Sequence, residues 1–394
     1  MGFQQGISGL NAASKNLDVI GHNIANSGTT GFKSARAEFA DLVATSMGVG
    51  SSNSAGVGVE VEAIAQQFTQ GNLTLTGNGM DVAINGGGFF KLQMPDGSPA
   101  YTRAGNFKLD KSGDVVTNGG THVMGYKVDP SNGVASSSTV PLSFPVGLPI
   151  AAKQTTEIKA ALNLDARAVG SAPPGTYGTS VTVHDSLGAP IPVHMDFVKT
   201  AANKWDVNVK DNGGATVGTG SLTFDTSGAM TSAPPITFTV PTASGGAAPS
   251  VTLNLANVTQ FGSKFAVSDM QQDGYAAGQL NNINISQDGS VVASYSNGVT
   301  RTEAQVALTG FRNPQGLVAV GGNNWVVSAD SGAPVDGKPG SGNLGSLRSG
   351  ALEESNVDLT AELVNMMTAQ RAYQANAQTI KTQDQVMSTM VNLR

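Results

Sequence analysis

Few residues in this chain have the types and spacing that catalysis or metal binding requires. The four histidines are His22, His122, His184 and His194, and none lies in the His-Glu-x-x-His pattern of zinc proteases. His184 and His194 could meet across two strands, although packing within a sheet is the expected role. Residues 110–114 have the oxygen-rich composition of a calcium loop but lack its bidentate glutamate, so we interpret them as a hairpin turn.

Glycines and serines offer no better basis for chemistry. Residues 77–79 and 86–88 lack the Lys-Ser/Thr pair and the following helix of a phosphate-binding loop, which indicates turns. Ser8 and Ser355 lie in no nucleophile-elbow motif. The absence of cysteine excludes disulfides and thiolate zinc sites. The sequence therefore predicts no catalytic residues, no cofactor and no metal, and the chain is not expected to be an enzyme.

The composition favours a protein that packs against copies of itself. Only 13% of the 394 residues are charged, 50 are glycine, and the net charge is −6. A mildly acidic chain does not provide the basic surface that nucleic acid requires. Weak self-repulsion makes close packing of many copies easier. We expect neither a cleaved signal peptide nor a membrane span, because no continuous apolar segment has the necessary position or length.

Both ends of the chain have the 3-4 spacing of apolar residues that is typical of amphipathic helices. The spacing predicts helices over residues 1–25 and 358–394, the second of which begins with a capping box at 355–358. The residues expected to mediate self-assembly through these helices are Phe3, Ile7, Leu10, Leu17, Ile24, Leu359, Leu363, Met366, Met367, Tyr373, Ile380, Met387 and Val391. Met366, Met367, Met387 and Met390 could either fill gaps in a core or form a seam that repacks easily.

One copy of the chain cannot cover both helices. A helix of this length spans about 50 Å, and an isolated helix pair with Gln370 and Asp384 in its seam is marginally stable in water. Packing the helices of many copies side by side covers the remaining faces, and repeated head-to-tail contacts produce a filament when the rotation does not close. We therefore predict a polymer.

The region between the helices is predicted to be β-structure. Turn signals at 77–79, 110–114, 288–289 and 297–298 separate short segments with alternating apolar residues, as in sandwiches and barrels. Proline and alanine become frequent after residue 141, and the earlier character returns near Gln279, which indicates an inserted domain. The predicted fold is mainly β with terminal α-helices: the helices form a coiled-coil-like inner domain, and two outer β domains follow, the outermost inserted in the inner one.

The predicted boundaries divide the chain into four parts. Residues 1–25 and 358–394 form the helical polymerisation domain, 26–71 and 346–357 a connecting segment, 72–145 and 277–345 a discontinuous inner β domain, and 146–276 the inserted outer β domain. In the connecting segment, Phe32, Phe39, Leu42 and Phe68 have no obvious core, so we expect them to contact neighbouring subunits. A solvated linker is the alternative, and glycines make residues 47–59 pliable.

Both ends of the chain resemble one family. The N-terminal segment reads SGLNAASKNLDVIGHNIANSGTTGFKSARAEFADL, and the C-terminal segment reads ALEESNVDLTAELVNMMTAQRAYQANAQTIKTQDQVMSTMVNLR. They resemble the signatures of bacterial flagellar rod, hook and hook-associated proteins, and TGNGMDVAINGGGFF is similar to a segment of that family's inner β domain. The residues that carry the signature are Asn23, Ile24, Ala25, Asn26, Gly31, Phe32, Lys33, Asn356, Val357, Asp358, Gln370 and Arg371.

The single outer insertion makes the chain look like the hook members of this family. The resemblance implies a structural subunit that assembles into a curved, hollow helical tube, a universal joint that transmits torque from rod to filament. It also implies a homopolymer, export through the flagellar type III apparatus, a location in the extracellular hook, and contacts with the hook cap, distal rod and hook–filament junction proteins. A rod or junction protein of the same family and, less in keeping with the termini, a secreted β-rich adhesin are the alternatives.

Overall fold

The chain folds into two compact units, each of which is built from separate stretches of the sequence. The computed structural model describes residues 2–43, 56–129, 132–144, 147, 149–168, 175–232, 234–242 and 245–392. Unit 1 comprises Met1–Phe144, Ile283–Ala293 and Arg301–Arg394, and unit 2 comprises Pro145–Asn282 and Ser294–Thr300. The predicted fold class, mainly β with a helix at each end, is confirmed. The four-part division of the sequence stays a prediction.

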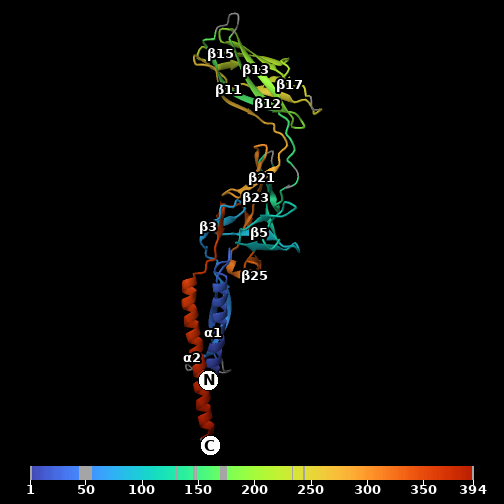
Figure 1. Ribbon diagram of the computed structural model, residues 1–394. Helices are drawn as coiled ribbons and strands as arrows, with labels where there is room; N and C mark the ends of the chain where they lie inside the picture. The colour runs from blue at the N-terminus through green and yellow to red at the C-terminus, as the bar shows by residue number, and fades with distance from the viewer. Residues whose placement is uncertain are drawn as a thin grey trace. The chain divides into compact units, whose positions relative to one another are not determined.

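Two long helices in unit 1, α1 (Gly2–Ala25) and α2 (Leu359–Asn392), lie side by side (Figure 1). The capping box expected at 355–358 is wrong in detail. Asp358 alone caps α2, because its Oδ1 accepts hydrogen bonds from the backbone N–H groups two and three residues further on. Within the described residues, no helix is long and apolar enough to cross a membrane.

The connecting segment contains a β-hairpin. Strand β1 (Ala35–Val43) pairs antiparallel with β2 (Gly56–Gln66), and the hairpin packs along α1. Residues 47–55 of the segment predicted to be pliable lie outside the described residues. The expectation that Phe32 and Phe68 lack a core is wrong: Phe32 is buried, and Phe68 packs edge-on against the rings of Phe89 and Trp325.

The β-structure of unit 1 is built on a large sheet with the strand order β21-β22-β23-β9-β5-β6-β26-β25. The predicted hairpin around residues 110–114 is confirmed as β7 paired with β8. Two small sheets, β28-β4 and β29-β3, join the strands before α2 to strands near the N-terminus. The large sheet contains β5 (Phe89–Gln93), β6 (Pro99–Thr102), β7 (Lys108–Leu109), β8 (Val115–Val116), β9 (His122–Val128), β10 (Ala135–Pro141), β21 (Leu280–Ile285), β22 (Ser290–Tyr295), β23 (Thr300–Val306), β24 (Leu308–Gly310), β25 (Val318–Gly321), β26 (Asn324–Val326) and β27 (Val335–Gly337), and the small sheets contain β3 (Leu73–Leu75), β4 (Val82–Asn85), β28 (Ser346–Ser349) and β29 (Ala351–Glu353); η1 (Pro314–Gly316) is a short 3-10 turn.

Unit 2 is a β-sandwich. One sheet runs β12-β13-β14-β15-β16, and the other runs β17-β18-β11-β19 with β20 on β11. Alternate residues of β11 and β14 are buried, as a half-buried strand requires, and Trp205 and Phe197 lie in the core between the sheets. The strands are β11 (Glu157–Asp165), β12 (Thr176–His184), β13 (Pro190–Ala201), β14 (Lys204–Lys210), β15 (Thr216–Phe224), β16 (Met230–Ser232), β17 (Ile236–Thr239), β18 (Ser250–Asn254), β19 (Thr259–Phe261) and β20 (Ala266–Gln272).

One kind of aspartate turn closes three hairpins of unit 2. Asp185, Asp211 and Asp225 each accept hydrogen bonds through Oδ1 from the backbone N–H groups two and four residues on. Asp110 does the same in unit 1. The pKa of Asp225 is held below its usual value by the hydroxyl of Ser227, which donates to Oδ1 at 2.7 Å, and by the backbone bonds, and the backbone bonds lower the pKa of Asp110, because these bonds favour the ionised carboxylate. The segment at 110–114 is therefore a turn organised by its own carboxylate.

Asp273 is expected to make the stability of unit 2 depend on pH. Burial alone raises its pKa, but hydrogen bonds from Glu157 and Thr156 and the Lys153 ammonium at 3.1 Å outweigh burial and hold the pKa below 3.8. A carboxyl whose pKa is lower in the folded state stabilises the fold above its unfolded pKa, and this contribution disappears as the pH falls through the folded pKa.

At neutral pH we expect Asp273→Asn to lower the free energy of unfolding of unit 2 by about 1–3 kcal/mol. The deficit should shrink as the pH falls from about 5 to about 2. Chemical denaturation of both proteins across this range measures it. A deficit that is constant with pH would contradict the assignment.

Candidate self-assembly site

The two terminal helices approach closely at glycines. A Cβ atom on Gly6 would lie 2.9 Å from the Ile380 side chain, and one on Gly9 would lie 2.9 Å from the Asn376 side chain. These contacts run in opposite sequence directions, so α1 and α2 are antiparallel. Small residues at this seam let the two backbones come together, and Ala369 of α2 is buried there as well. The side of α1 that faces α2 is therefore the glycine row, not the row of large apolar residues that the spacing singled out.

The other side of α1 holds the β1–β2 hairpin through Ser8. The backbone N–H of Val59 donates a hydrogen bond to Ser8 Oγ at 3.3 Å. A Cβ on Gly58, whose φ is +146°, would lie 2.2 Å from the same oxygen. Ser8 therefore contacts the hairpin, and the next residue, Gly9, contacts α2.

Two asparagines of the signature tie the helices to the chain around them, and we call Asn23 and Asn356 the amide clamps. Asn23 is buried near the end of α1, where it exchanges two hydrogen bonds with the backbone of Ala35 and donates a third to Glu362 of α2 at 3.1 Å. Asn356 accepts from the backbone N–H of Ser34 at 2.7 Å and donates to the carbonyl oxygen of Gln67 at 2.7 Å. Each side-chain amide therefore joins segments far apart in sequence.

A buried charge cluster lies beside the amide clamps and consists of Lys33, Arg103 and Glu353. Lys33 Nζ is 2.6 Å from one carboxylate oxygen of Glu353, and Arg103 Nη1 is 3.3 Å from the other. The side chains of Lys33 and Glu353 are completely buried. The backbone N–H of Gly71 also donates to Glu353, at 3.0 Å. One carboxylate thus joins the segment after α1, the β6–β7 loop and the strand before α2.

Burial dominates the electrostatics of the cluster. Desolvation lowers the pKa of Lys33 and of Arg103, while Glu353 opposes the shift in both. Arg103 Nε has no hydrogen-bond partner within the described part of the chain, although its guanidinium lies over the ring of Phe89 at 5.4 Å. The cluster contains two cations and one anion, so both ion pairs depend on Glu353.

At Gly31 the backbone passes close to the loop that carries Arg103. The φ of Gly31 is +69°, and a Cβ would lie 2.5 Å from the backbone nitrogen of Ala104. Its N–H donates to the carbonyl oxygen of Glu353 at 2.7 Å. Any side chain here would both strain the backbone and displace the loop.

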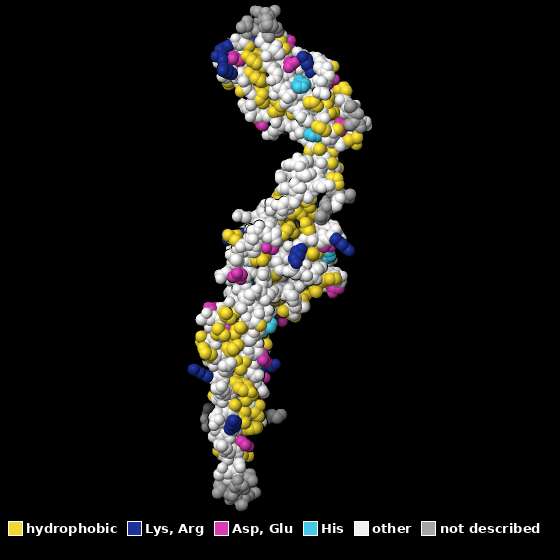
Figure 2. Space-filling view, in the orientation of Figure 1, with side chains coloured by type: hydrophobic (Ala, Val, Ile, Leu, Met, Phe, Trp, Pro, Cys, Tyr) yellow, Lys and Arg dark blue, Asp and Glu magenta, His cyan; other side chains and the backbone are white. Residues whose placement is uncertain are grey.

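The large apolar residues predicted to mediate assembly remain substantially exposed on the helix pair. The exposed fraction is 50% for Phe3, 46% for Leu363 and 60% for Met387. Figure 2 shows hydrophobic side chains gathered along this part of unit 1. Among the predicted residues, those exposed are Phe3, Ile7, Leu359, Leu363, Met367, Tyr373 and Met387, while those partly buried are Leu10, Leu17, Ile24, Met366 and Ile380. The side chain of Val391 lies outside the described residues.

Other signature residues have local roles or face solvent. Asn26, just after the end of α1, donates a hydrogen bond from Nδ2 to the carbonyl oxygen of His22. The ring of Phe32 packs against the ring of His22, with 5.4 Å between the ring centroids. Asp358 caps α2. The remaining four are Ala25, Gln370 and Arg371, which are exposed, and Val357, which is partly buried.

The structure brings no chemical site together at the histidines. In the β12–β13 register, His184 lies opposite Pro190 and His194 lies opposite Ser180, so the two rings are not cross-strand partners. The described residues contain no group of three or more side chains that could hold a metal ion.

Sequence reasoning missed Arg103, Glu353 and Gly6. Nothing in the local pattern of ALEES distinguishes Glu353 from a solvent-exposed acid, since its partners lie hundreds of residues away. Gly6 and Gly9, by contrast, lie about one helical turn apart, and two small residues at this spacing could have suggested a close contact between helices.

Four protein-family profiles match separate segments of the chain. They are described as "Flagella basal body rod protein" over residues 3–33, "Flagellar hook protein FlgE/F/G D1 domain" over 83–161, "Flagellar basal body protein FlaE D2 domain" over 163–275 and "Flagellar basal body rod FlgEFG protein C-terminal" over 348–393.

Full-length relatives and a solved structure agree with these matches. The chain is 42% identical over 412 residues to the flagellar hook protein FlgE of Salmonella typhimurium and 41% identical to that of Escherichia coli (strain K12), with 100% of both chains covered in each case. The crystal structure of Helicobacter pylori flagellar hook protein FlgE2 is similar in fold, with a TM-score of 0.57 and 16% identity, covering 71% of this chain and 100% of that one.

Proposed function

Because the chain belongs to the flagellar hook protein family, and is thus a structural subunit that forms the flagellar hook, we propose that its terminal helices hold neighbouring hook subunits together. The observation that carries this proposal is the row of exposed apolar residues on the paired helices, which a single copy leaves uncovered. Membership of the family implies a polymer of hook subunits. Apolar side chains at this spacing would be sheltered by the same helices of the next copies.

In this proposal the polymer is a curved, hollow tube that acts as a universal joint between rod and filament. The helices would form its inner layer, because among the described elements they combine an extended apolar face with lengths of about 36 Å for α1 and about 51 Å for α2. The β-structure, with its own buried cores, would lie outside that layer. Export through the type III apparatus and contacts with the hook cap, distal rod and junction proteins belong to the same proposal.

The amide clamps and the buried charge cluster would transmit force between the helices and the β-structure. Asn23, Asn356 and Glu353 each bond to at least two chain segments, so a pull on the helices is shared by several hydrogen bonds. This feature supports a role in torque transmission.

Two aspartates placed on the exposed face of α2 test the proposal. In the variant Leu363→Asp, Met367→Asp, each charge would be buried without a partner when copies assemble, while the lone subunit keeps both side chains in water. We expect the concentration needed for polymerisation to rise at least about 100-fold, corresponding to about 3 kcal/mol per contact. Sedimentation of the purified chain measures this concentration.

The matched control is Gln374→Asp, Gln378→Asp, which adds the same charges at the same spacing on exposed polar positions of α2. Circular dichroism should show unchanged helix content in both variants. Normal polymerisation of the Leu363, Met367 variant would remove the basis of the proposal.

A further inference from the structure

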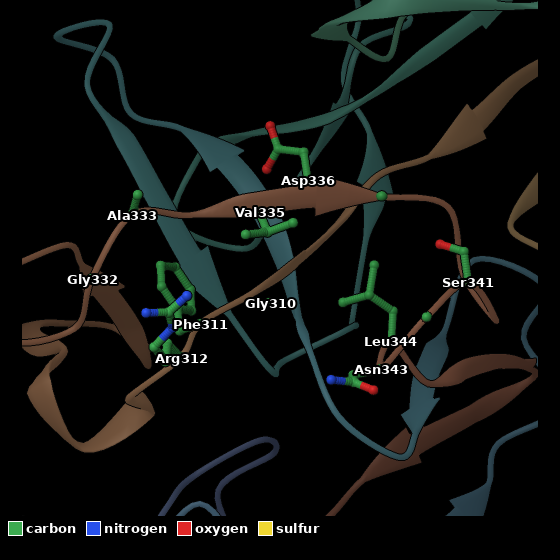
Figure 3. Close-up of a pocket in the computed structure, with 12 residues that line it drawn as sticks. Gly310, Phe311, Arg312, Gly332, Ala333, Val335, Asp336, Ser341, Asn343 and Leu344 are labelled. Carbon is green, nitrogen blue, oxygen red and sulfur yellow. The ribbon is translucent and has the colours of Figure 1, made fainter.

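Unit 1 contains an open apolar groove that the terminal helices do not use. It has a volume of about 660 Å³ and lies along β24 and β27 and the loop that follows β27. Figure 3 shows Phe311, Val335 and Leu344 around the hollow, with Arg312 at one end and Asn343 at the other. Val335, one of the apolar residues that line it, is 67% exposed.

Glycines shape the floor of the groove. The Leu344 side chain rests on Gly88, Gly310 and Gly337, where added Cβ atoms would lie 3.1, 3.3 and 2.6 Å from its methyl groups. Any larger residue at Gly337 would displace Leu344 and change the shape of the hollow. The groove is therefore a built feature of the inner β-structure.

The charge that the groove leaves unpaired is positive. Asp336 is occupied by Lys91 and by Thr309, whose hydroxyl donates to it at 2.6 Å. Arg312, which lines the groove, is exposed and forms no ion pair within the described residues. The groove thus combines an apolar floor with one available cation.

The β1–β2 hairpin presents the complementary surface. Phe39, Leu42 and Ile64 are 42%, 38% and 54% exposed. Asp41, Glu60 and Glu62 are exposed on the same two strands, and none forms an ion pair within the described part of the chain. Because side chains alternate along a strand, Phe39, Asp41 and Ile64 lie on one face of the hairpin, and Leu42 and Glu60 lie on the other. Each face therefore combines apolar side chains with unpaired negative charge.

We propose that this groove binds the β1–β2 hairpin of a second copy of the chain. A chain's own hairpin is held along α1 through Ser8 and Val59, so the occupant comes from another molecule. In this contact Arg312 faces Glu60 of the incoming hairpin, and Leu42, on the same face of the hairpin, covers Val335. The inference rests on the proposed polymer and adds a second, separate contact between its subunits.

Cysteine crosslinking tests the contact, because the native chain has no cysteine. Leu42→Cys and Val335→Cys are made in separate chains, copolymerised in equal amounts and treated with a short bismaleimide. We expect covalent dimers that contain one copy of each variant, distinguished by a tag on one of them. Val134→Cys, 63% exposed in the same unit, replaces Val335→Cys in the control and should give at most one tenth of the product.

A charge exchange provides the second readout. Arg312→Glu should raise the concentration needed for polymerisation about 10-fold, and adding Glu60→Arg to the same chain should restore most of that loss. Polymers that form normally but give no Leu42–Val335 product would overturn the docking contact and leave the helix-based assembly intact. Failure of the unmodified chain to polymerise would instead overturn the proposed assembly, and this contact with it.

Discussion

Glu353→Gln is expected to lower the free energy of unfolding of unit 1 by about 3–5 kcal/mol. The carboxylate is fully buried and pairs with Lys33 at 2.6 Å and Arg103 at 3.3 Å. A neutral amide would leave two cations in a desolvated site without the anion that pairs with both, and removing one partner of a buried ion pair costs more than the pair itself contributes. Calorimetry, which follows the unfolding transition of each unit, measures the loss.

Two further variants test whether the loss of stability comes from the unpaired charges. Glu354→Gln changes the adjacent exposed residue and should have little effect. Replacing the whole cluster, with Lys33→Met, Arg103→Met and Glu353→Leu, should recover much of the lost stability because no unpaired charge remains. A Glu353→Gln protein as stable as the wild type would mean that the cluster does not hold these segments together.

Removing residues 2–25 and 359–394 is expected to abolish polymerisation completely. The deletion takes away both helices and every exposed apolar residue on them, but leaves the sandwich core of unit 2 and the aromatic cluster around Trp325 intact. The product should be a folded monomer at concentrations where the full chain forms polymers. Electron microscopy and sedimentation report assembly, and circular dichroism reports the β-structure.

A smaller deletion separates the helix contact from a general loss of solubility or folding. Removing only residues 385–394 leaves the pairing of α1 with α2 in place and should weaken polymerisation without abolishing it. Polymers formed by the protein that lacks both helices would refute assembly through the termini.

The sequence predicted the elements better than it predicted their contacts. Apolar spacing located both helices to within two residues, because periodicity reports directly which positions avoid water. It could not say which partner covers each face. The large apolar row was predicted to mediate self-assembly, but the pattern did not show that Gly6 and Gly9 form the seam between the helices and leave Phe3 and Leu363 exposed.

Polar pairing over long sequence distances was beyond local reasoning. The signature placed Asn23, Lys33 and Asn356 among the important residues, but their roles depend on Glu353 and Arg103, which carry no local signal. Phe68 appeared to have no core because Phe89 and Trp325 lie far along the chain. Local pattern therefore indicates that a residue is constrained, while the identity of its partner requires the fold.

The unequal lengths of the two helices have a consequence for growth. Gly6 lies opposite Ile380, so the last turns of α2, with Val386, Met387 and Met390 exposed, extend past the start of α1. Each molecule thus carries an overhang that its own short helix cannot reach. In a stack of such molecules, the overhangs at one extremity are filled by the next layer and those at the opposite extremity stay bare. The two extremities would then gain and lose molecules at different rates. The structure of each subunit would therefore determine the end at which the polymer elongates faster.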